Sequence, residues 1–253
     1  MTIEGYPEWG GHRSRIQKKG NVMRNSMKWM VVTGFMVSAS FGFADWFDGF
    51  EDGLGDWVVG SGAPVPVAEP FDALTSYTVG AFTVNPHSGS YLMAPNPSLT
   101  ASDDKYWMDR TEGFATGGEQ GTLTAYVNIA SSVSAPASSL LAGAYDSASG
   151  KDVWVGYNRN AATLYYRGTG VAQTYTSIPI STRSWHKIVF ESGDTGTTLY
   201  IDDTFIFTDT TMTQMDKVRV AATYWGGVGV PRILVDDVLF TTLPDQGTLL
   251  YIR

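Results

Sequence analysis

Apolar and polar residues alternate along several short segments of this chain, and no comparable segment has the spacing of an amphipathic helix. Turn-forming pairs such as Ser149-Gly150 and Gly226-Gly227 separate these segments at the short intervals typical of antiparallel strands. Each such strand packs one face and leaves the other to water. The pattern therefore predicts an all-β fold, a two-layer antiparallel β-sandwich of the jelly-roll type, with strands in residues 123–129, 153–157, 163–166, 218–224 and 233–240.

The hairpin pattern is clearest in residues 185–206, where two alternating segments flank the glycines of residues 193–196. The apolar positions, expected to face the core, are Ile188, Phe190, Leu199 and Ile201. The positions expected to meet water are Lys187, Glu191, Tyr200 and Asp202. Trp185, at the strand entry, is interpreted as a packing residue, because a lone tryptophan beside a hairpin usually buries its ring.

The first 44 residues differ from the rest of the chain. Lys28 precedes an apolar stretch of about 15 residues, and Gly42-Phe43-Ala44 offers small residues at the positions that a signal peptidase inspects. This predicts a leader with a signal-peptide helix over 1–44, starting at Met1, Met23 or Met27. The stretch is shorter than the roughly 20 residues of a membrane span, so the mature chain is expected to hold no stable span. The protein is then expected to be secreted or at the cell surface, in the extracellular space or the periplasm.

Residues 45–242 are expected to form one jelly-roll domain, which is a common size for a single β domain. Residues 243–253 are expected to form a C-terminal tail, because chain ends are usually disordered unless tied down. From Leu243 the sequence also resembles the start of a Pro-Glu-Pro sorting signal of exported Gram-negative proteins, here cut short. Both interpretations of the tail stay open.

The exported part of the chain is strongly acidic. The sequence holds 17 basic and 25 acidic residues, and loss of residues 1–44 leaves 11 and 23, a net charge of −12. Such a charge repels nucleic acid and anionic lipid and disfavours densely anionic polysaccharides. A neutral glycan is the expected partner, and the protein is expected to be a monomer. The chain has no cysteine, so its stability must come from the core or from bound ions.

Two acidic pairs lie near opposite ends of the predicted domain, Glu51-Asp52 and Asp236-Asp237. If the first and last strands pair, these four carboxylates converge, and without a cation they would repel one another. Carboxylate oxygens are the hard ligands that Ca²⁺ prefers. The sequence therefore predicts a structural calcium ion at this place. The alternative is that the four acids cap turns or face solvent.

Sugar recognition needs flat aromatic faces for the C–H edges of pyranose rings and short polar groups for the hydroxyls. The predicted aromatic contacts are Trp154, Tyr166 and Trp225, and Trp154 should face away from its apolar neighbours on the strand. Asn158 and Arg159 follow that strand and are predicted to add hydrogen bonds, unless they form an ordinary turn. Core packing is the alternative role for each ring. Further aromatic candidates are Tyr106, Trp107, Tyr157, Tyr165 and Tyr224.

Four stretches together resemble the laminin-G-like branch of the concanavalin A-like lectin and glucanase superfamily, and they span nearly all of the predicted mature chain. They are WHKIVF to LYIDD within 185–203, FDGFEDGLGDW at 47–57, HSGSYLMA at 87–94 and ILVDDVLF at 233–240. Asp203 stands where that family usually has glycine. The resemblance implies a jelly roll of the carbohydrate-binding-module type, with a structural calcium between Gly49-Phe50-Glu51 and Asp236-Asp237-Val238.

A polysaccharide-degrading enzyme of the same fold, a lyase or a glycoside hydrolase, is the alternative function. Glucanases of this superfamily carry a Glu, Asp, Glu set on one strand, which this chain lacks. Its alginate-lyase branch pairs an Arg-Thr-Glu strand with Gln-x-His; this chain has Arg110-Thr111-Glu112 but no Gln-x-His. No catalytic residue is assigned, and the expected function is noncatalytic, lectin-like carbohydrate binding. A structural surface or adhesion protein is the third class.

Overall fold

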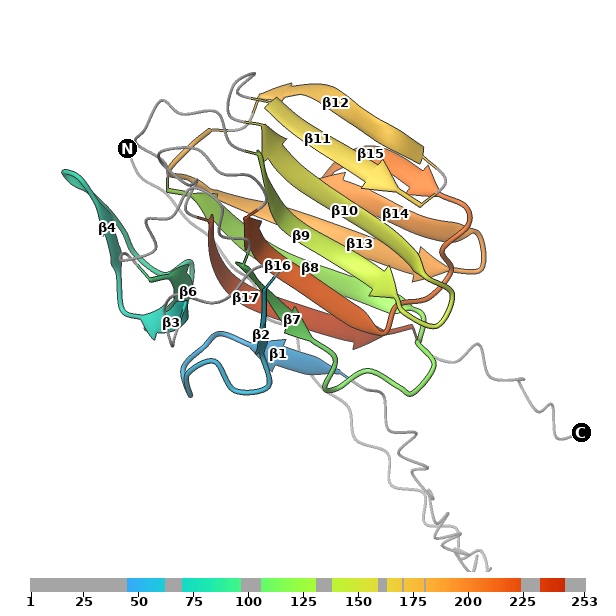
Figure 1. Cartoon of the computed structure of the whole chain (residues 1–253), viewed down its shortest axis with the longest axis horizontal. Helices are drawn as coiled ribbons and strands as arrows, with labels where there is room; N and C mark the ends of the chain where they lie inside the picture. Colours follow the sequence, from blue (N-terminus) through green and yellow to red (C-terminus); the bar gives the residue numbers. More distant parts are fainter. Residues whose placement is uncertain are drawn as a thin grey trace, which may run out of the picture. The chain divides into compact units, whose positions relative to one another are not determined.

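The computed structural model describes residues 45–61, 70–96, 106–130, 138–158, 163–169, 171–179, 181–223 and 233–243. The chain divides into a unit of residues 1–39 and a unit of residues 40–253, and every described residue belongs to the second unit. The described residues form 17 β-strands and no helix (Figure 1). The all-β prediction is therefore confirmed for this part of the chain.

In chain order the strands are β1 (Trp46–Asp48), β2 (Val58–Ser61), β3 (Phe71–Leu74), β4 (Tyr77–Val79), β5 (Phe82–Val84), β6 (Leu92–Pro95), β7 (Tyr106–Arg110), β8 (Gly121–Ile129), β9 (Ser138–Asp146), β10 (Lys151–Asn158), β11 (Thr163–Gly168), β12 (Val171–Pro179), β13 (Trp185–Gly193), β14 (Gly196–Ile201), β15 (Thr204–Asp209), β16 (Lys217–Thr223) and β17 (Ile233–Thr242).

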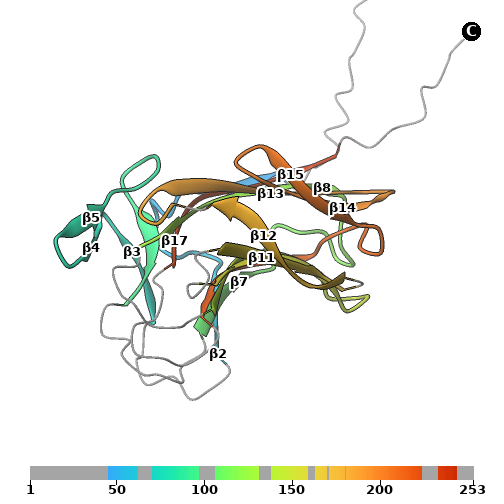
Figure 2. The same cartoon turned by 90° about the horizontal axis from the view of Figure 1, so that it is seen from above.

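Two antiparallel sheets build the sandwich. The eight-stranded sheet has the order β15-β14-β13-β8-β17-β6-β3, with β1 pairing to β17 beside this path. The seven-stranded sheet has the order β12-β11-β10-β9-β16-β7-β2, and β4 and β5 form a separate two-stranded sheet. Seen from above in Figure 2, β13 and β8 lie in one layer and β11 and β7 in the other.

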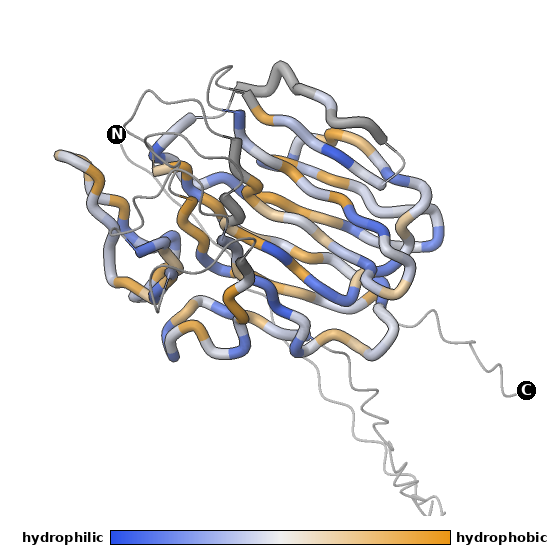
Figure 3. Tube along the Cα trace, viewed as in Figure 1, coloured by the Kyte–Doolittle hydropathy of each residue, from blue (hydrophilic) through white to orange (hydrophobic). Residues whose placement is uncertain are grey.

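The core lies between the two sheets because each strand turns every second side chain inward. Leu123, Phe190 and Val235 of the eight-stranded sheet are fully buried, as are Val155 and Val218 of the seven-stranded sheet. The same alternation is visible as changing hydropathy along the strands in Figure 3. Burying these side chains is the main favourable contribution to folding.

The first and last strands of the described domain lie side by side, as predicted. Asp48 pairs with Val238, and β1 continues antiparallel along β17 to Trp46 and Phe240. On its other edge β17 pairs with β8, and its register shifts between Asp236 and Leu239. Asp237 lies in this β-bulge with φ 47°, a backbone conformation that aspartate tolerates better than most residues.

The hairpin predicted in residues 185–206 is confirmed. β13 and β14 pair from Ile188 with Ile201 to Gly193 with Gly196. All four positions expected to face the core are almost fully buried, and Lys187, Glu191 and Tyr200 are accessible. The next turn holds Asp202 and Asp203 at φ 48° and 61°, where glycine or aspartate is favoured in a two-residue hairpin turn. Trp185 is half-buried, and its Nε1 donates to the carbonyl oxygen of Asn85.

The predicted leader (1–44) and most of the predicted tail (243–253) lie outside the described residues. The signal-peptide helix and the cleavage near Ala44 fall there too and stay predictions. In the part of the chain that the structure describes, no helix is long and apolar enough to cross a membrane.

Candidate functional site

The carboxylates of Asp236 and Asp237 both reach the loop that follows β5, because the bulge in β17 turns the two neighbouring side chains toward it. Asp236 Oδ2 accepts hydrogen bonds from the backbone N–H of His87 at 2.7 Å and of Ser88 at 3.3 Å. Asp237 Oδ1 accepts from Ser88 Oγ at 2.6 Å, and its Oδ2 lies 2.6 Å from His87 Nδ1. The two carboxylates therefore fasten this loop to the last strand.

Glu51 reaches the same loop from the segment after β1. Its Oε1 accepts hydrogen bonds from the backbone N–H groups of Ser90 and Tyr91, at 2.5 and 3.3 Å. A Cβ atom on Gly89 would lie 2.1 Å from this oxygen, so only glycine allows the approach. Three of the four predicted calcium ligands thus converge on residues 87–91, and Asp52 is exposed in a neighbouring pocket.

The calcium ion itself stays a prediction, although three of its predicted ligands lie near one loop. Within the described ranges no group of three or more His, Cys, Asp or Glu side chains is arranged to hold a metal ion. The carboxylate oxygens are of the type that Ca²⁺ accepts, and further ligands would have to come from Asp52, from backbone carbonyl groups or from water.

Asp236 is fully buried and lies next to a second carboxylate. Desolvation and, to a smaller extent, the charge of Asp237 raise its pKa, while the hydrogen bonds from Asp237, His87 and Ser88 act in the opposite direction, and the net result is a pKa raised from 3.8 to about 6. The first two effects are larger. A proton or a cation at this place would relieve the repulsion between Asp236 and Asp237.

The predicted glycan contacts do not lie on one face of the seven-stranded sheet. Trp154 is partly exposed and faces away from the core, as the alternation predicts. Tyr166 pairs with Val155 rather than with Trp154, so it points inward and stacks on Phe207 at 4.3 Å between ring centroids. The core-packing alternative therefore describes Tyr166. Asn158 ends β10, and Arg159 and Trp225 lie outside the described residues.

Other aromatic residues accompany Trp154 on its outward face. Tyr165 meets it edge to face, with 5.4 Å between ring centroids, although Tyr165 itself is 4% exposed. The Arg219 guanidinium lies 4.3 Å from the ring centroid of Trp107 and 5.2 Å from that of Tyr145. The alternation around β7 and β11 marks Trp107 and Tyr165 as outward-facing, but the sequence shows no reason to prefer them over other aromatic residues.

An ion pair fixes the position of Arg219 on this face. Its Nε and Nη2 donate to the two carboxylate oxygens of Asp109 on the neighbouring strand β7, at 2.6 and 2.7 Å. Two-point pairing of this kind orients the guanidinium plane. Trp107 in turn lies over Gly60, where a Cβ atom would come within 1.8 Å of Trp107 Nε1. The ion pair and Gly60 therefore hold the rings in one arrangement.

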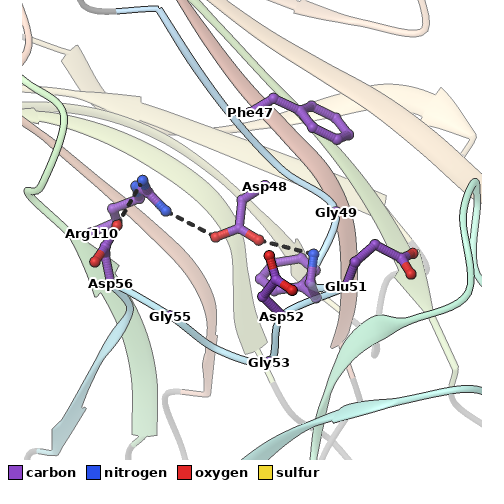
Figure 4. Close-up of a pocket in the computed structure, with 10 residues that line it drawn as sticks. Phe47, Asp48, Gly49, Glu51, Asp52, Gly53, Gly55, Asp56 and Arg110 are labelled. Carbon is purple, nitrogen blue, oxygen red and sulfur yellow. Dashed lines mark hydrogen bonds and ion pairs between the residues drawn. The ribbon is translucent and has the colours of Figure 1, made fainter.

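The Arg110-Thr111-Glu112 motif has a visible structural role. Arg110 donates to Asp48 Oδ2 at 2.9 Å and to Asp56 Oδ2 at 3.1 Å, and its guanidinium lies 4.2 Å from the ring centroid of Trp46. Arg110, Asp48 and Asp56 line a pocket of about 310 Å³ that Figure 4 shows. Arg110 is buried and points to the edge of the core, away from the outward face that carries Trp154.

The two histidines in the described domain are both engaged by aspartates. His186 Nδ1 lies 2.7 Å from Asp202 Oδ2, and its Nε2 lies 2.8 Å from the carbonyl oxygen of Ser181. His87 Nδ1 contacts Asp237 Oδ2, and the His87 ring stacks on the Tyr126 ring with 3.7 Å between the ring centroids. Carboxylate and carbonyl oxygens at the two ring nitrogens of His186 suit a hydrogen-bonding residue that holds two segments together.

Comparison with protein-family models and with curated protein sequences finds no match. Solved structures do match. "Cellulose induced protein, Cip1" aligns at TM-score 0.52 and 15% identity, over 77% of this chain and 96% of that one. "Crh5 transglycosylase in complex with NAG" aligns at TM-score 0.51 and 14% identity, over 79% and 85%. Trypanosoma rangeli sialidase aligns at TM-score 0.44 and 13% identity, over 69% of this chain but only 28% of its own. The first two likenesses show a shared β-sandwich fold.

Proposed function

We propose that this protein binds carbohydrate without catalysis, through the outward face of the seven-stranded sheet. The observation that carries the proposal is the group of partly exposed rings on that face, Trp107, Tyr145 and Trp154. Aromatic rings in fixed positions offer the flat apolar surfaces on which pyranose rings stack. The fold of the Crh5 transglycosylase, whose structure was determined with NAG, supports a carbohydrate-related role.

The charged groups on this face position the rings and offer hydrogen bonds. Arg219 covers part of Trp107 and Tyr145 and is itself paired with Asp109. Because this pair is close to neutral, it can meet sugar hydroxyls without demanding a charged ligand. Together with the net charge of −12 expected for residues 45–253, this favours a neutral glycan. Trp154 is the ring that we expect to contribute most to affinity.

Replacing Trp154 by alanine is expected to weaken glycan binding about tenfold, because loss of one stacking ring removes roughly 1.4 kcal/mol of binding free energy. The measurement is a glycan array followed by calorimetry with the strongest oligosaccharide. Tyr166→Phe is the matched control: it keeps the ring that stacks on Phe207, and binding should not change. Equal affinity of wild type and Trp154→Ala, or silence of the wild type across the array, would contradict the proposal.

A structural calcium ion at Glu51, Asp236 and Asp237 is part of the proposal. Their convergence on residues 87–91 supports it, and Asp52 offers a further exposed carboxylate nearby. A bound ion would compensate the two adjacent buried carboxylates and tie the first and last strands to this loop. Any resulting Ca²⁺ requirement of glycan binding would be indirect, because the outward face of the other sheet carries the rings.

Chelation with EGTA is expected to lower the melting temperature, and excess Ca²⁺ should restore it. A ligand that binds only the folded state adds about 2.7 kcal/mol at a hundred times its dissociation constant. Glu51→Gln should abolish the response to EGTA, while Asp72→Asn, a surface acid on β3, should leave it intact. A melting temperature that is unchanged by EGTA in the wild type would show that no structural calcium is bound.

The acidic exported domain and the apolar stretch before Ala44 also support export as part of this proposal. The polysaccharide would then be met outside the cytoplasm, where a chain without cysteine has no thiol to oxidise.

A further inference from the structure

A continuous row of side chains crosses the outward face of the eight-stranded sheet. The strand registers place Phe47 opposite Leu239, Leu239 opposite Thr124, and Thr124 opposite Val189. Val189 pairs with Tyr200, and Tyr200 pairs with Phe205 on the edge strand β15. Six strands spaced about 4.8 Å apart give this row a length of roughly 24 Å.

The two ends of the row are unusually exposed apolar rings. Phe47 is 60% exposed and Phe205 is 59% exposed, whereas phenylalanine normally lies inside a protein. Tyr200 contacts Phe205 edge to face at 6.1 Å and is partly exposed. Exposed apolar side chains that share one line across a sheet mark an interaction surface more strongly than scattered ones.

A second row runs beside the first, two residues farther along β17, β8, β13 and β14 and three residues farther along β15. It contains four threonines and one glutamate, in the order Thr241, Thr122, Glu191, Thr198 and Thr208. Side chains two residues apart on a strand are about 7 Å apart, so the hydroxyl row follows the apolar row at short range. Thr198 and Thr208 share a hydrogen bond between their hydroxyl oxygens at 2.9 Å. Glu191 is the one charged residue in the two rows.

We propose that this face is a second carbohydrate site and binds an extended, uncharged polysaccharide chain lying across the strands. The apolar row offers stacking surfaces at Phe47, Tyr200 and Phe205, and the threonine row offers hydroxyl groups alongside. A strip with a single charge, in a domain of expected net charge −12, matches a neutral polymer and repels an anionic one. The length of the row requires several consecutive sugar rings, so short oligosaccharides should bind weakly.

This second site does not depend on the proposed function, because it lies on the opposite layer of the sandwich from Trp154. Figure 2 shows the two sheets as separate layers, and the strands of one row all belong to the eight-stranded sheet. A chain bound at one face would leave the other face accessible. The two sites can therefore be disabled one at a time.

Affinity electrophoresis in native gels tests the proposal with the full domain. The gels contain hydroxyethylcellulose, galactomannan or arabinoxylan as neutral probes, and carboxymethylcellulose as an anionic probe with the same backbone as the first. We expect wild type to be retarded by at least one neutral polymer and not by carboxymethylcellulose. The double variant Phe47→Ser, Phe205→Ser should lose about tenfold or more in affinity, and so should Tyr200→Ala.

Matched variants separate the two sites and control for folding. Val58→Ser removes a side chain of similar exposure from β2 of the other sheet and should keep the retardation. Trp154→Ala should also keep the retardation, although it weakens the binding of short oligosaccharides. Far-UV circular dichroism and melting temperatures of all variants should match wild type, since the replaced phenylalanines are mostly exposed.

Three results would overturn the second site. The first is absence of retardation in all three neutral gels, and the second is retardation that Trp154→Ala removes while the phenylalanine variants keep it. The third is a wild type that forms dimers in sedimentation analysis and becomes monomeric on Phe205→Ser, which would assign this face to a second copy of the chain. The polysaccharide site is supported if the phenylalanine and Tyr200 variants lose the retardation and the Trp154→Ala and Val58→Ser variants keep it. The effect of Trp154→Ala on short oligosaccharides does not bear on this result.

Discussion

Replacing Arg110 by alanine is expected to lower the free energy of unfolding by about 3 kcal/mol, because a buried ion pair that loses one partner leaves an uncompensated charge. The Arg110 and Asp48 side chains are 9% and 14% exposed. Asp48 would keep the hydrogen bonds from the Phe50 N–H and Trp57 Nε1 but lose its cation. Trp46 would also lose the guanidinium stacked on its ring.

Denaturant unfolding measures this difference, and Asp56→Asn is the control. Asp56 also pairs with Arg110, but its side chain is 53% exposed, so its loss should cost less than about 1 kcal/mol. A cost for Arg110→Ala no larger than that of Asp56→Asn would show that the arginine is not structural, and the lyase alternative would then regain weight. Retained glycan binding in the folded variant would separate this role from ligand recognition.

In the presence of EGTA, the stability of the domain is expected to fall as the pH rises from about 4 to about 6. Asp236 has a pKa near 3.8 when unfolded and about 6 when folded. The folded state therefore binds the proton more tightly, so this contribution is complete below pH 3.8 and is lost as the pH passes 6. A shift of about two units corresponds to at most about 3 kcal/mol.

Asp236→Asn removes this titration and should flatten the stability profile between pH 4 and 6. Its amide oxygen can still accept from the N–H groups of His87 and Ser88, so the loop should stay in place. The pH profile comes from chemical denaturation at fixed ionic strength. The other carboxylates are the same in both proteins, so the difference between the two profiles reports Asp236 alone. If the wild-type profile in EGTA matched that of Asp236→Asn, the assignment of this pH dependence to Asp236 would be wrong.

Alternation along the strands was enough to predict the fold class and the core. Ile188, Phe190, Leu199 and Ile201 all lie where period two places them, because a strand turns successive side chains to opposite faces. The pairing of the first and last strands also followed from the motifs that they carry.

The glycan contacts were harder to predict, because the sequence does not indicate which of the adjacent residues Tyr165 and Tyr166 faces outward. The sequence predicts Tyr166 as a contact, yet the register with β10 turns its ring onto Phe207 and turns Tyr165 toward Trp154. The ion pair that orients Arg219 joins residues 110 positions apart. A pattern of neighbouring residues in the sequence cannot predict a contact between residues so far apart.

The calcium ligands show the same limit. Four acidic residues were predicted to meet, and three of them converge on residues 87–91 because the bulge at Asp237 redirects two neighbouring side chains at once. The bulge adds one residue to one strand, and simple alternation cannot anticipate it.

By itself, the sequence determined that this chain forms antiparallel strands with one buried face, since side-chain polarity and the period of a strand are local properties. Only the tertiary structure decided which outward side chains become neighbours. The row from Phe47 to Phe205 draws on six strands, and cross-strand register, set by hydrogen bonding between distant segments, is what aligns them.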